Sequence, residues 1–410
     1  MVQDIRIEDY TYPLTEDRIA HYPLAQRDDS KLLLFTNHTG RVPETAKFRD
    51  IAAYLPEKSI VVFNETKVVP ARLFFRKDTG ATIEIFCLEP FDPKDYQLCF
   101  AQTSSCSWKT IVGNSKRWKS DRVKLFVSED AGKEIKSINL QAERLESSGE
   151  TSVVRFSWDG GWSFSQVLEH CGRIPIPPYL KRETEAVDLE RYQTCYALRE
   201  GSVAAPTAGL HFTQRELDDL DSRGIERYKL CLHVGAGTFL PVKSEKIGDH
   251  PMHSEPFSVS RQLVEMLRDK GTRPLTAVGT TSTRCLESLY FIGVHCIENG
   301  EPGLVEQWEP YRENGYKYTL RESMDALLAY MDKKGLDALT SRTRIIIVPG
   351  YEFRVIDYLV TNFHQPQSTL LLLIGAFVGD AWHDIYSYAL DNGYRFLSYG
   401  DSSLLQRKIV

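Results

Sequence analysis

The sequence predicts an α/β body that carries an inserted all-β, barrel-like domain. Over most of the 410 residues, apolar β-branched runs end at Gly, Pro or Asn and alternate with helical patterns. That alternation is typical of an α/β fold. The stretch 64–156 instead offers short alternating runs divided by polar and glycine turns, as in a barrel or sandwich. The length also suits two or three domains of roughly 100–200 residues each.

The body is predicted from residues 1–63 and 157–410. Its expected strands are 59–63, 229–234, 275–278, 344–348 and 358–360. Helical patterns lie between these runs. Thr213 with Glu216 three residues on forms a capping-box signature, and Leu263, Met266 and Leu267 have the spacing of a buried helix face.

The inserted domain is predicted from residues 64–156. Its expected strands include 72–75, 82–87, 96–100, 123–127 and 152–156, and we find no convincing amphipathic helix among them. A second irregular stretch, 295–342, forms an extra insertion within the body. Its centre, 320–334, has the pattern of a helix.

Composition restricts the class of protein. The chain is 42% hydrophobic and 26% charged, and its net charge is −6, which excludes a histone-like polycation but not a local basic patch. The most apolar run, 370–378, is far shorter than the about 20 residues of a membrane helix. The first residues lack the features of a signal peptide, and the eight cysteines form no CxxC pair. We expect a cytoplasmic protein with free thiols, no membrane segment and no metal.

Two loops rich in small residues surround His211 and His233. They are VAAPTAGLHFT (203–213) and LHVGAGTFLPV (232–242). Small residues let a backbone approach a ligand closely, and loops at strand ends form the ligand sites of α/β folds. Tight turns with satisfied histidines remain the alternative. Gly235 and Gly237 lack the third glycine of a dinucleotide fingerprint, so we reject a Rossmann site.

The segment AVGTTSTRCLES (277–288) predicts an anion site. An apolar strand ends at Gly279, and Thr280, Thr281 and Arg284 follow at the start of a helix. A helix N-terminus attracts a carboxylate or phosphate, and Arg284 adds a fork of donors. An ordinary N-cap would explain one threonine but not the whole run.

Two further groups of residues leave alternatives open. His250, His253 and Glu255 lie in HPMHSE, whose spacing matches no common helical zinc motif, so we prefer acid–base work or substrate contacts. The basic run 116–124 either contacts phosphates or forms a solvated hairpin. Asp401 follows a glycine, and a single such Asp is more often a turn former than a catalytic acid.

Together the motifs resemble the S-adenosylmethionine:tRNA ribosyltransferase-isomerases of queuosine biosynthesis. The matching stretches occur in the same order as in the family, from near residue 60 to near residue 400. Its stretches include FNETKVVPARL (63–73), GRIPIPPYLKR (172–182), VAAPTAGLHFT, LHVGAGTFLPV, VGTTSTRCLES (278–288), TNFHQPQST (361–369) and YRFLSYGD (394–401). The chain departs from the family at 64–67, where Asn-Glu-Thr-Lys replaces Asn-Asp-Thr-Arg, and in a longer 295–342 stretch.

The resemblance implies a defined reaction. The ribosyl moiety of S-adenosylmethionine is transferred and isomerised onto 7-aminomethyl-7-deazaguanine at the tRNA wobble position, giving epoxyqueuosine-tRNA, adenine and methionine. S-adenosylmethionine is a co-substrate, and no cofactor or metal is required. The partners are S-adenosylmethionine and the tRNA anticodon stem-loop. Two alternatives stay open: a paralogue with altered or lost substrate that binds RNA, and an S-adenosylmethionine methyltransferase.

This chemistry needs several proton transfers, which suit histidine or a carboxylate of shifted pKa. For them we expect His211, His233, His253 and Glu255. The expected substrate-binding residues are Tyr179, Thr207, Gly235, Gly237, Thr280, Thr281, Arg284, Asn362, His364 and Asp401. The expected tRNA-binding residues are Arg72, Lys116, Arg117, Lys119, Lys181 and Arg182.

Overall fold

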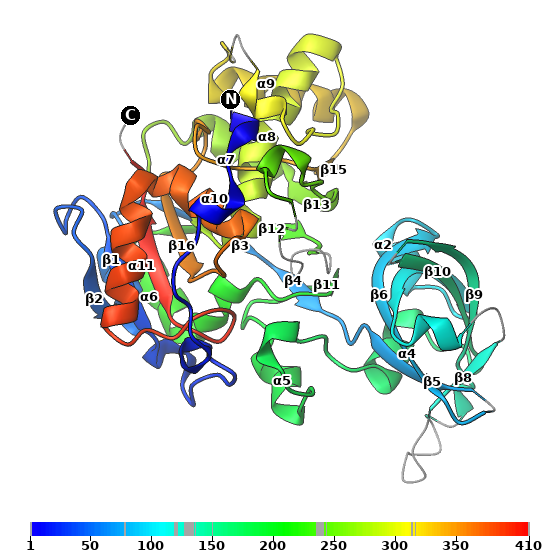
Figure 1. Ribbon diagram of the computed structural model, residues 1–410. Coiled ribbons are helices and arrows are strands. Elements are labelled where there is room, and N and C mark those ends of the chain that lie inside the picture. The colour runs from blue at the N-terminus through cyan, green and yellow to red at the C-terminus, as the bar shows by residue number, and fades with distance from the viewer. Residues whose placement is uncertain are drawn as a thin grey trace.

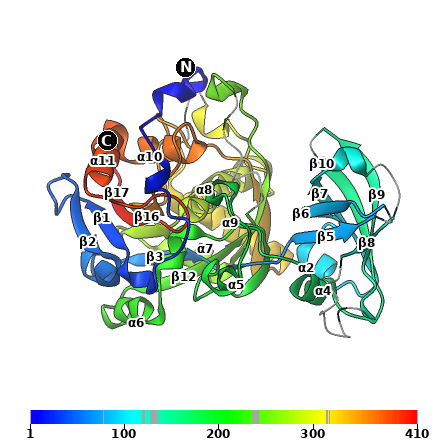
Figure 2. The same cartoon turned by 60° about the horizontal axis from the view of Figure 1, so that its bottom comes forward.

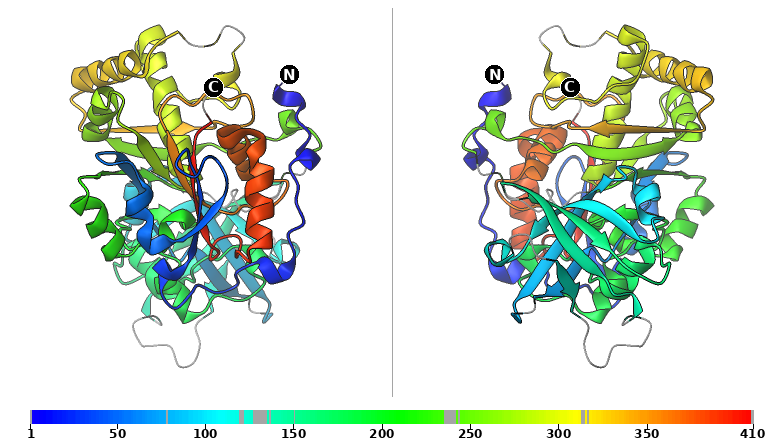
Figure 3. Two further views of the ribbon diagram at one scale, coloured as in Figure 1. Left: turned by 90° about the vertical axis from the view of Figure 1, so that its left-hand side faces the viewer. Right: turned by 90° about the vertical axis from the view of Figure 1, so that its right-hand side faces the viewer.

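A nine-stranded mixed sheet and a separate closed barrel form the core of the molecule (Figure 1). The computed structural model describes residues 2–77, 79–118, 122–126, 135, 137–149, 151–234, 242, 244–312, 315 and 317–408. The predicted fold class, an α/β body with an inserted all-β domain, is confirmed. The barrel lies to one side of the body in Figure 1 and in front of it in the right-hand view of Figure 3.

The large sheet has a parallel centre, and all but one of the strand pairs outside it are antiparallel. Its order is β15 (Ala338–Thr343), β13 (Glu255–Ser260), β12 (Glu226–Leu232), β3 (Ile60–Asn64), β14 (Leu275–Val278), β16 (Tyr358–Asn362), β17 (Ser402–Gln406), β1 (Lys31–Phe35) and β2 (Glu44–Lys47). Outside the centre, the exception is the parallel pair of β1 and β17. Strands β12, β3, β14 and β16 run parallel. Their carboxyl ends therefore meet at one edge, where α/β folds bind ligands.

Helices cover both faces of this sheet. The helices of the body are α1 (Ile51–Tyr54), α5 (Ala186–Arg191), α6 (Gln214–Ser222), α7 (Arg261–Asp269), α8 (Thr280–Asn299), α9 (Leu320–Lys334), α10 (Thr369–Val378) and α11 (Trp382–Asp391). Ile60 and Val62 of β3 pack in the core formed with α7 and α8, whereas Val61 and Phe63 pack in the core formed with α1 and α6. Because side chains alternate along a strand, this continuous apolar run is buried on both faces.

The barrel closes through six strands. Their order is β10 (Thr151–Ser157), β7 (Ser105–Val112), β6 (Thr82–Asp92), β5 (Arg72–Arg76), β8 (Val123–Leu125) and β9 (Gln141–Ser148). Helix α4 (Phe164–Cys171) packs Phe164 against Trp108, Phe156 and Trp158 of the barrel core. The barrel strands thus occupy 72–157, and β4 (Thr66–Val68) pairs instead with β11 (Arg199–Ser202) in a two-stranded sheet.

Two predicted strands are wrong. Residues 96–100 form the short helix α2 (Tyr96–Phe100), because the Asp95 carboxylate accepts from the Leu98 N–H at 2.9 Å and caps it. Residues 345–348 are buried and Arg344 is exposed, and the segment forms no strand. Its backbone groups bond both to a neighbouring loop and to side chains: the Arg344 N–H donates to the Val305 carbonyl at 2.9 Å, the Arg284 Nε donates to the Ile345 carbonyl at 3.1 Å, and the Tyr311 hydroxyl donates to the Ile346 carbonyl at 3.0 Å.

Several local predictions are confirmed. The capping box of Thr213 and Glu216 starts α6, and Leu263, Met266 and Leu267 are buried on α7. The helix expected at 320–334 is α9. The 295–342 stretch begins inside α8, which continues to Asn299, and it ends in β15 at the edge of the large sheet. Among the described residues, no helix is long and apolar enough to cross a membrane.

Candidate active site

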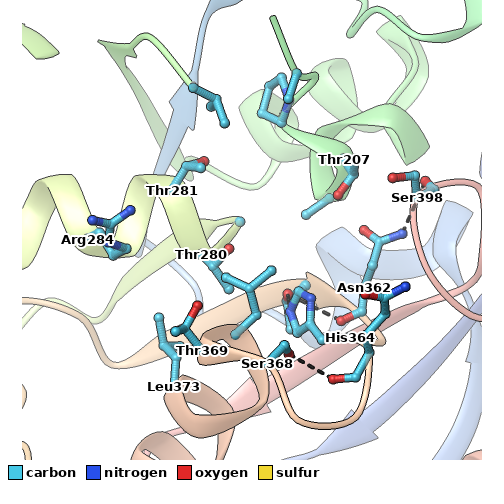
Figure 4. Close-up of a pocket in the computed structure, with 18 of the residues that line it drawn as sticks. Thr207, Thr280, Thr281, Arg284, Asn362, His364, Ser368, Thr369, Leu373 and Ser398 are labelled. Carbon is cyan, nitrogen blue, oxygen red and sulfur yellow. Dashed lines mark hydrogen bonds between the residues drawn. The ribbon is translucent and has the colours of Figure 1, made fainter. Parts of the chain in front are cut away.

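A pocket opens at the carboxyl edge of the two neighbouring parallel strands β14 and β16. The chain turns from β14 into α8 at Gly279, and from β16 toward α10 after Asn362. The pocket is lined by residues of both corners and by the small-residue segment 204–208. Figure 4 shows Thr207, Thr280, Asn362 and His364 around one hollow.

The start of α8 forms one wall. Gly279 has φ 91°, in the region that favours glycine, and its N–H donates to the Val360 carbonyl of β16 at 2.8 Å. The first helical bond runs from the Thr283 N–H to the Gly279 carbonyl at 3.1 Å. The N–H groups before Thr283 have no partner within the helix. Thr280 and Thr281 line the pocket, so this helix start can hold an anion.

Arg284 lies one turn further along α8 and is 8% exposed. Its Nη1 donates to the Glu255 carboxylate, and its Nε donates to the Ile345 carbonyl at 3.1 Å. Among the described residues, its Nη2 and the Glu255 Oε1 have no hydrogen-bond partner. Both residues line the pocket. A buried ion pair with one open donor and one open acceptor can therefore contact a ligand.

Glu287 does not pair with Arg284. Its carboxylate accepts from the Tyr351 hydroxyl at 2.9 Å and from the backbone N–H groups of residues 354, 355 and 356 at 2.9–3.1 Å. Burial raises the pKa of Glu287. The Glu287 carboxylate thus bonds α8 to the loop before β16, and Arg284 pairs with Glu255 instead.

A second helix start faces the same pocket. Ser368 caps α10, because its Oγ accepts from the Leu371 N–H at 3.2 Å. Ser368, Thr369 and Leu370 line the pocket, as does Thr280 at the start of α8 (Figure 4). Two positive helix ends thus face one cavity, which favours negatively charged groups of a ligand.

His364 lies between the two helix starts and is 8% exposed. Its Nε2 contacts the Thr361 Oγ1 at 2.9 Å, and its backbone N–H donates to the Tyr386 hydroxyl at 3.1 Å. Burial lowers the pKa of His364 to about 4. The imidazole is therefore neutral near pH 7 and able to accept a proton.

His211 contacts the pocket only through Asn362. The Asn362 Nδ2 donates to the Leu397 carbonyl at 3.0 Å, which identifies it as the amide nitrogen, and it lies 3.3 Å from the His211 Nε2. Nε2 therefore accepts, and Nδ1–H donates to the Ser30 Oγ at 2.9 Å. Burial lowers the pKa of His211 to about 4. The Asn362 Oδ1 is buried without a partner among the described residues.

His253 and Tyr179 complete the pocket rim. His253 is exposed beside His250 and Met252, and all three line the pocket. Burial, with the adjacent His253 as a smaller cause, lowers the pKa of His250. The Tyr179 hydroxyl lies 2.5 Å from the Ser398 Oγ, and burial raises the pKa of Tyr179 to about 12.

Comparisons with known proteins place the chain in a family. The profile of a family described as queuosine biosynthesis protein matches residues 7–405. A Halothermothrix orenii protein named S-adenosylmethionine:tRNA ribosyltransferase-isomerase is 38% identical, covering 98% of this chain and 100% of that protein. A Pelodictyon phaeoclathratiforme protein of the same name is 37% identical over 98% of this chain and 100% of its own length.

The chain belongs to the queuosine biosynthesis protein family. A crystal structure of an S-adenosylmethionine tRNA ribosyltransferase from Thermotoga maritima is 26% identical, with a TM-score of 0.46, and covers 97% of this chain and 99% of that chain.

In this member of the queuosine biosynthesis family, nine predicted site residues line the pocket. They are Tyr179, Thr207, His253, Glu255, Thr280, Thr281, Arg284, Asn362 and His364. Gly235, Gly237 and Lys119 lie outside the described residues. Asp401 is buried away from the pocket, where its carboxylate accepts from the backbone N–H groups of Lys31 at 3.0 Å and Arg395 at 2.8 Å.

His233 lies at the contact between body and barrel. Its ring stacks on Tyr96 of α2, with centroids 4.3 Å apart and an interplanar angle of 8°. Burial lowers the pKa of His233 to about 4. A Cβ on Gly201 would lie 2.5 Å from the His233 Nδ1, so this glycine makes room for the stack.

The predicted tRNA-binding residues fall in two places. Lys181 pairs with Glu16 at 2.6 Å, and Arg182 donates two bonds to Asp188, both at 2.8 Å, on the body. Arg72 is on β5 and pairs with Glu84 at 2.7 Å. Lys116 and Arg117 are exposed in the turn after β7.

Sequence reasoning missed two parts of the pocket. One is the set of pocket residues at the start of α10, Ser368, Thr369 and Leu370; the helix start itself is expected from TNFHQPQST, with Ser368 or Thr369 as its cap, and Ser368 is the cap. The other is the wall formed by 345–347, which the strand prediction concealed. Among the described residues, no cluster of three or more His, Cys, Asp or Glu side chains has the arrangement of a metal site.

Proposed function

We propose that this protein is an S-adenosylmethionine:tRNA ribosyltransferase-isomerase. It transfers and isomerises the ribosyl moiety of S-adenosylmethionine onto 7-aminomethyl-7-deazaguanine at the tRNA wobble position, and releases adenine and methionine. The observation that carries the proposal is the pocket itself, in which two helix starts, an open ion pair and a neutral histidine converge. Full-length relatives with this name support it.

The donor's methionine end binds at the start of α8 in this proposal. Its carboxylate accepts from the N–H groups before Thr283 and from the open Arg284 Nη2. Glu255 remains paired with Arg284 and keeps one free oxygen toward the pocket. That oxygen suits the donor's ammonium group, because a buried carboxylate is stabilised by a second cation.

The proton transfers need groups that reach the donor and can accept or release a proton. His364 fits this role by its position, because it lines the pocket, and burial, which lowers its pKa to about 4, keeps its imidazole neutral near pH 7. We keep His253 and Glu255 among the proton-transfer residues, since both line the pocket. His211 acts through Asn362, whose open Oδ1 accepts from a substrate N–H. His233 supports the docking of the barrel.

The acceptor base must leave its stack to enter this pocket. We propose that the domain 64–156 holds the anticodon stem-loop while the body, 1–63 and 157–410, performs the chemistry. S-adenosylmethionine is a co-substrate, and the scheme requires no cofactor or metal. The reaction takes place in the cytoplasm, where its tRNA substrate is found; the free state of all eight cysteines is consistent with that compartment.

Release of adenine tests the proposal. The purified protein is mixed with S-adenosylmethionine and tRNA carrying 7-aminomethyl-7-deazaguanine, and small products are separated by chromatography. A ribosyltransferase-isomerase releases adenine and methionine only when this tRNA is present. S-adenosylhomocysteine would instead identify a methyltransferase, and an absence of any product with intact tRNA binding would identify an RNA-binding paralogue.

A further inference from the structure

The outer wall of the barrel carries a row of cations and aromatic rings on β5 and β8. Along β5, Leu73 and Phe75 point into the barrel core, so Arg72, Phe74 and Arg76 point outward. Lys124 of β8 is directly opposite Arg76 in the antiparallel register, and Phe126 follows it. We call the outward side chains of 72, 74, 76, 124 and 126 the β5 face.

The aromatic rings of this face are covered by guanidinium groups. The Arg76 Cζ lies 3.8 Å from the centroid of the Phe126 ring, and Phe126 is 41% exposed. The Arg173 Cζ lies 4.8 Å from the centroid of the Phe74 ring. Planar guanidinium groups stacked on rings at an exposed surface form the cation–π arrangement on which a nucleobase can also stack.

Backbone pairing fixes Arg173 in this position. Arg72 and Arg173 exchange backbone hydrogen bonds of 3.1 and 2.8 Å. A Cβ on Gly172 would lie 1.9 Å from the Pro70 carbonyl oxygen, so only glycine permits this close approach. Arg173 is therefore held beside the β5 face although it lies about a hundred residues further along the chain.

Of the cations on this face, Arg72 has a carboxylate partner among the described residues. Glu84 pairs with Arg72 at 2.7 Å. Among the described residues, no carboxylate pairs with Arg76, Lys124 or Arg173. Like charges directly opposite each other on paired strands are destabilising, and Arg76 with Lys124 is such a pair. A polyanion bound here would relieve that repulsion.

We infer that the β5 face, together with Arg173, is a platform for unpaired nucleotides of the tRNA next to its anticodon. The exposed Phe126 ring, the partly buried Phe74 ring and the guanidinium groups on them distinguish this surface from a patch that only attracts phosphates, because single-stranded RNA stacks its bases on aromatic and arginine side chains of β-surfaces. The inference rests on the proposed function for the identity of the RNA. It adds Phe74, Arg76, Phe126 and Arg173 to the residues that contact it, and it includes Lys124 of the basic run 116–124.

Two variants separate charge from stacking. Arg76→Gln combined with Arg173→Gln should weaken binding of a fluorescently labelled anticodon stem-loop about tenfold and reduce the salt slope of log Kd by about 1.4, because two phosphates are no longer neutralised. Phe126→Ala should weaken binding about tenfold by loss of base stacking, with the salt slope unchanged. S-adenosylmethionine affinity, measured without RNA, should equal that of the wild type in both.

The barrel offers a matched control on its opposite wall. Strand β10 is three strands from β5 in either direction around the barrel, and its Arg155 is exposed. Figure 2 shows the barrel standing apart from the body with these strands around it. Arg155→Gln removes the same charge and should leave stem-loop affinity within error of the wild type.

The outcomes distinguish the two proposals. Wild-type binding of the stem-loop, with unchanged binding by the β5-face variants, overturns the platform and leaves the proposed function intact. Equal losses in the Arg155→Gln control and the double variant also overturn it, because total charge rather than this face would then decide binding. A wild-type protein that binds no tRNA overturns both the platform and the proposed function.

Discussion

The pocket and the β5 face both use arginine, in opposite settings. Arg284 is 8% exposed and is held by Glu255 and the Ile345 carbonyl. Arg76 lies open on Phe126, and none of the described carboxylates pairs with it. A buried charge must be paired to remain stable, whereas an exposed cation keeps its hydration and loses little. The pocket therefore suits one small ligand with few fixed contacts, and the β5 face suits a polyanion with many weak ones.

The largest effect is expected from breaking the buried pair. Arg284→Met removes the open Nη2 donor, and a charge-assisted hydrogen bond is worth about 1.5–3 kcal/mol, so donor affinity should fall about ten- to a hundredfold. It also leaves Glu255 buried without its cation, which should cost about 3–5 kcal/mol of stability. tRNA affinity should barely change. Calorimetric titration with S-adenosylmethionine and thermal unfolding measure the two effects.

A double variant separates binding from stability. Arg284→Met with Glu255→Gln removes the stranded charge and should recover most of the thermal stability. If donor affinity recovers with it, the arginine only holds the fold. An unchanged dissociation constant in the folded single variant would also reject the assignment of Arg284 to the donor.

The next effect is the loss of stability in acid caused by three buried histidines, of which His364 lines the pocket. Burial lowers the pKa of His211, His233 and His364 from 6.5 to about 4. Below about pH 6.5 these histidines bind protons in the unfolded chain but stay neutral in the folded chain. Their contribution to the free energy of unfolding is therefore fully present above that pH and is lost as the pH falls toward 4. At pH 5, each histidine should have lowered the free energy of unfolding by about 2 kcal/mol.

His364→Gln provides the measurement for one of these groups. Chemical unfolding at pH 8 and pH 5 should show a smaller difference between the two pH values for this variant than for the wild type, by about 2 kcal/mol. An identical pH dependence would mean that the pKa of His364 is the same in the folded and the unfolded chain, so that burial does not lower it.

A smaller effect tests His211 as a positioning residue. His211→Phe keeps the ring against Phe48, whose centroid is 4.9 Å away, but removes the acceptor for the Asn362 amide. One hydrogen bond is worth about 1 kcal/mol, so kcat/KM for ribosyl transfer should fall about fivefold. His211→Gln can accept the same bond and should restore most of the rate. Equal rates in both variants would limit His211 to packing.

The smallest effect concerns the turn after β7. Lys116→Glu with Arg117→Glu should weaken tRNA binding less than the β5-face variants do, and should flatten its salt dependence by about 0.7 for each phosphate that is no longer neutralised. Donor affinity should stay constant. Unchanged tRNA affinity, measured beside the Arg155→Gln control, would identify this turn as a solvated hairpin and sharpen the boundary of the RNA surface.

The two regions differ in how much the sequence could predict. The α8 corner is local: an apolar strand, Gly279 and a run of hydroxyl residues are consecutive, so the helix start could be expected. The pairing of Arg284 with Glu255 could not, because it depends on β13 lying beside β12 across the sheet. The same holds for Arg173, which reaches Phe74 only through the pairing of Arg72 with Arg173.

Short segments caused the wrong predictions. Five residues from Tyr96 to Phe100 fit a strand or a helix by their apolar pattern alone. The Asp95 side chain caps the first turn and stabilises the helix. The run 344–348 is apolar enough for a strand, yet its backbone bonds go to a distant loop at Val305 and to the side chains of Arg284 and Tyr311, which no local pattern reveals.

The mutual hydrogen bonds of Arg72 and Arg173 have a mechanical consequence. They hold the segment that enters the barrel, at Arg72, beside the segment that leaves it, at Arg173. A domain joined to the body by one flexible connection can rotate about it in any direction. Two connections that are hydrogen-bonded to each other still allow bending but restrict twisting. The stack of His233 on Tyr96 is a second contact between the body and the barrel domain. A hinge motion of the barrel about this pairing would change the distance between the β5 face and the pocket.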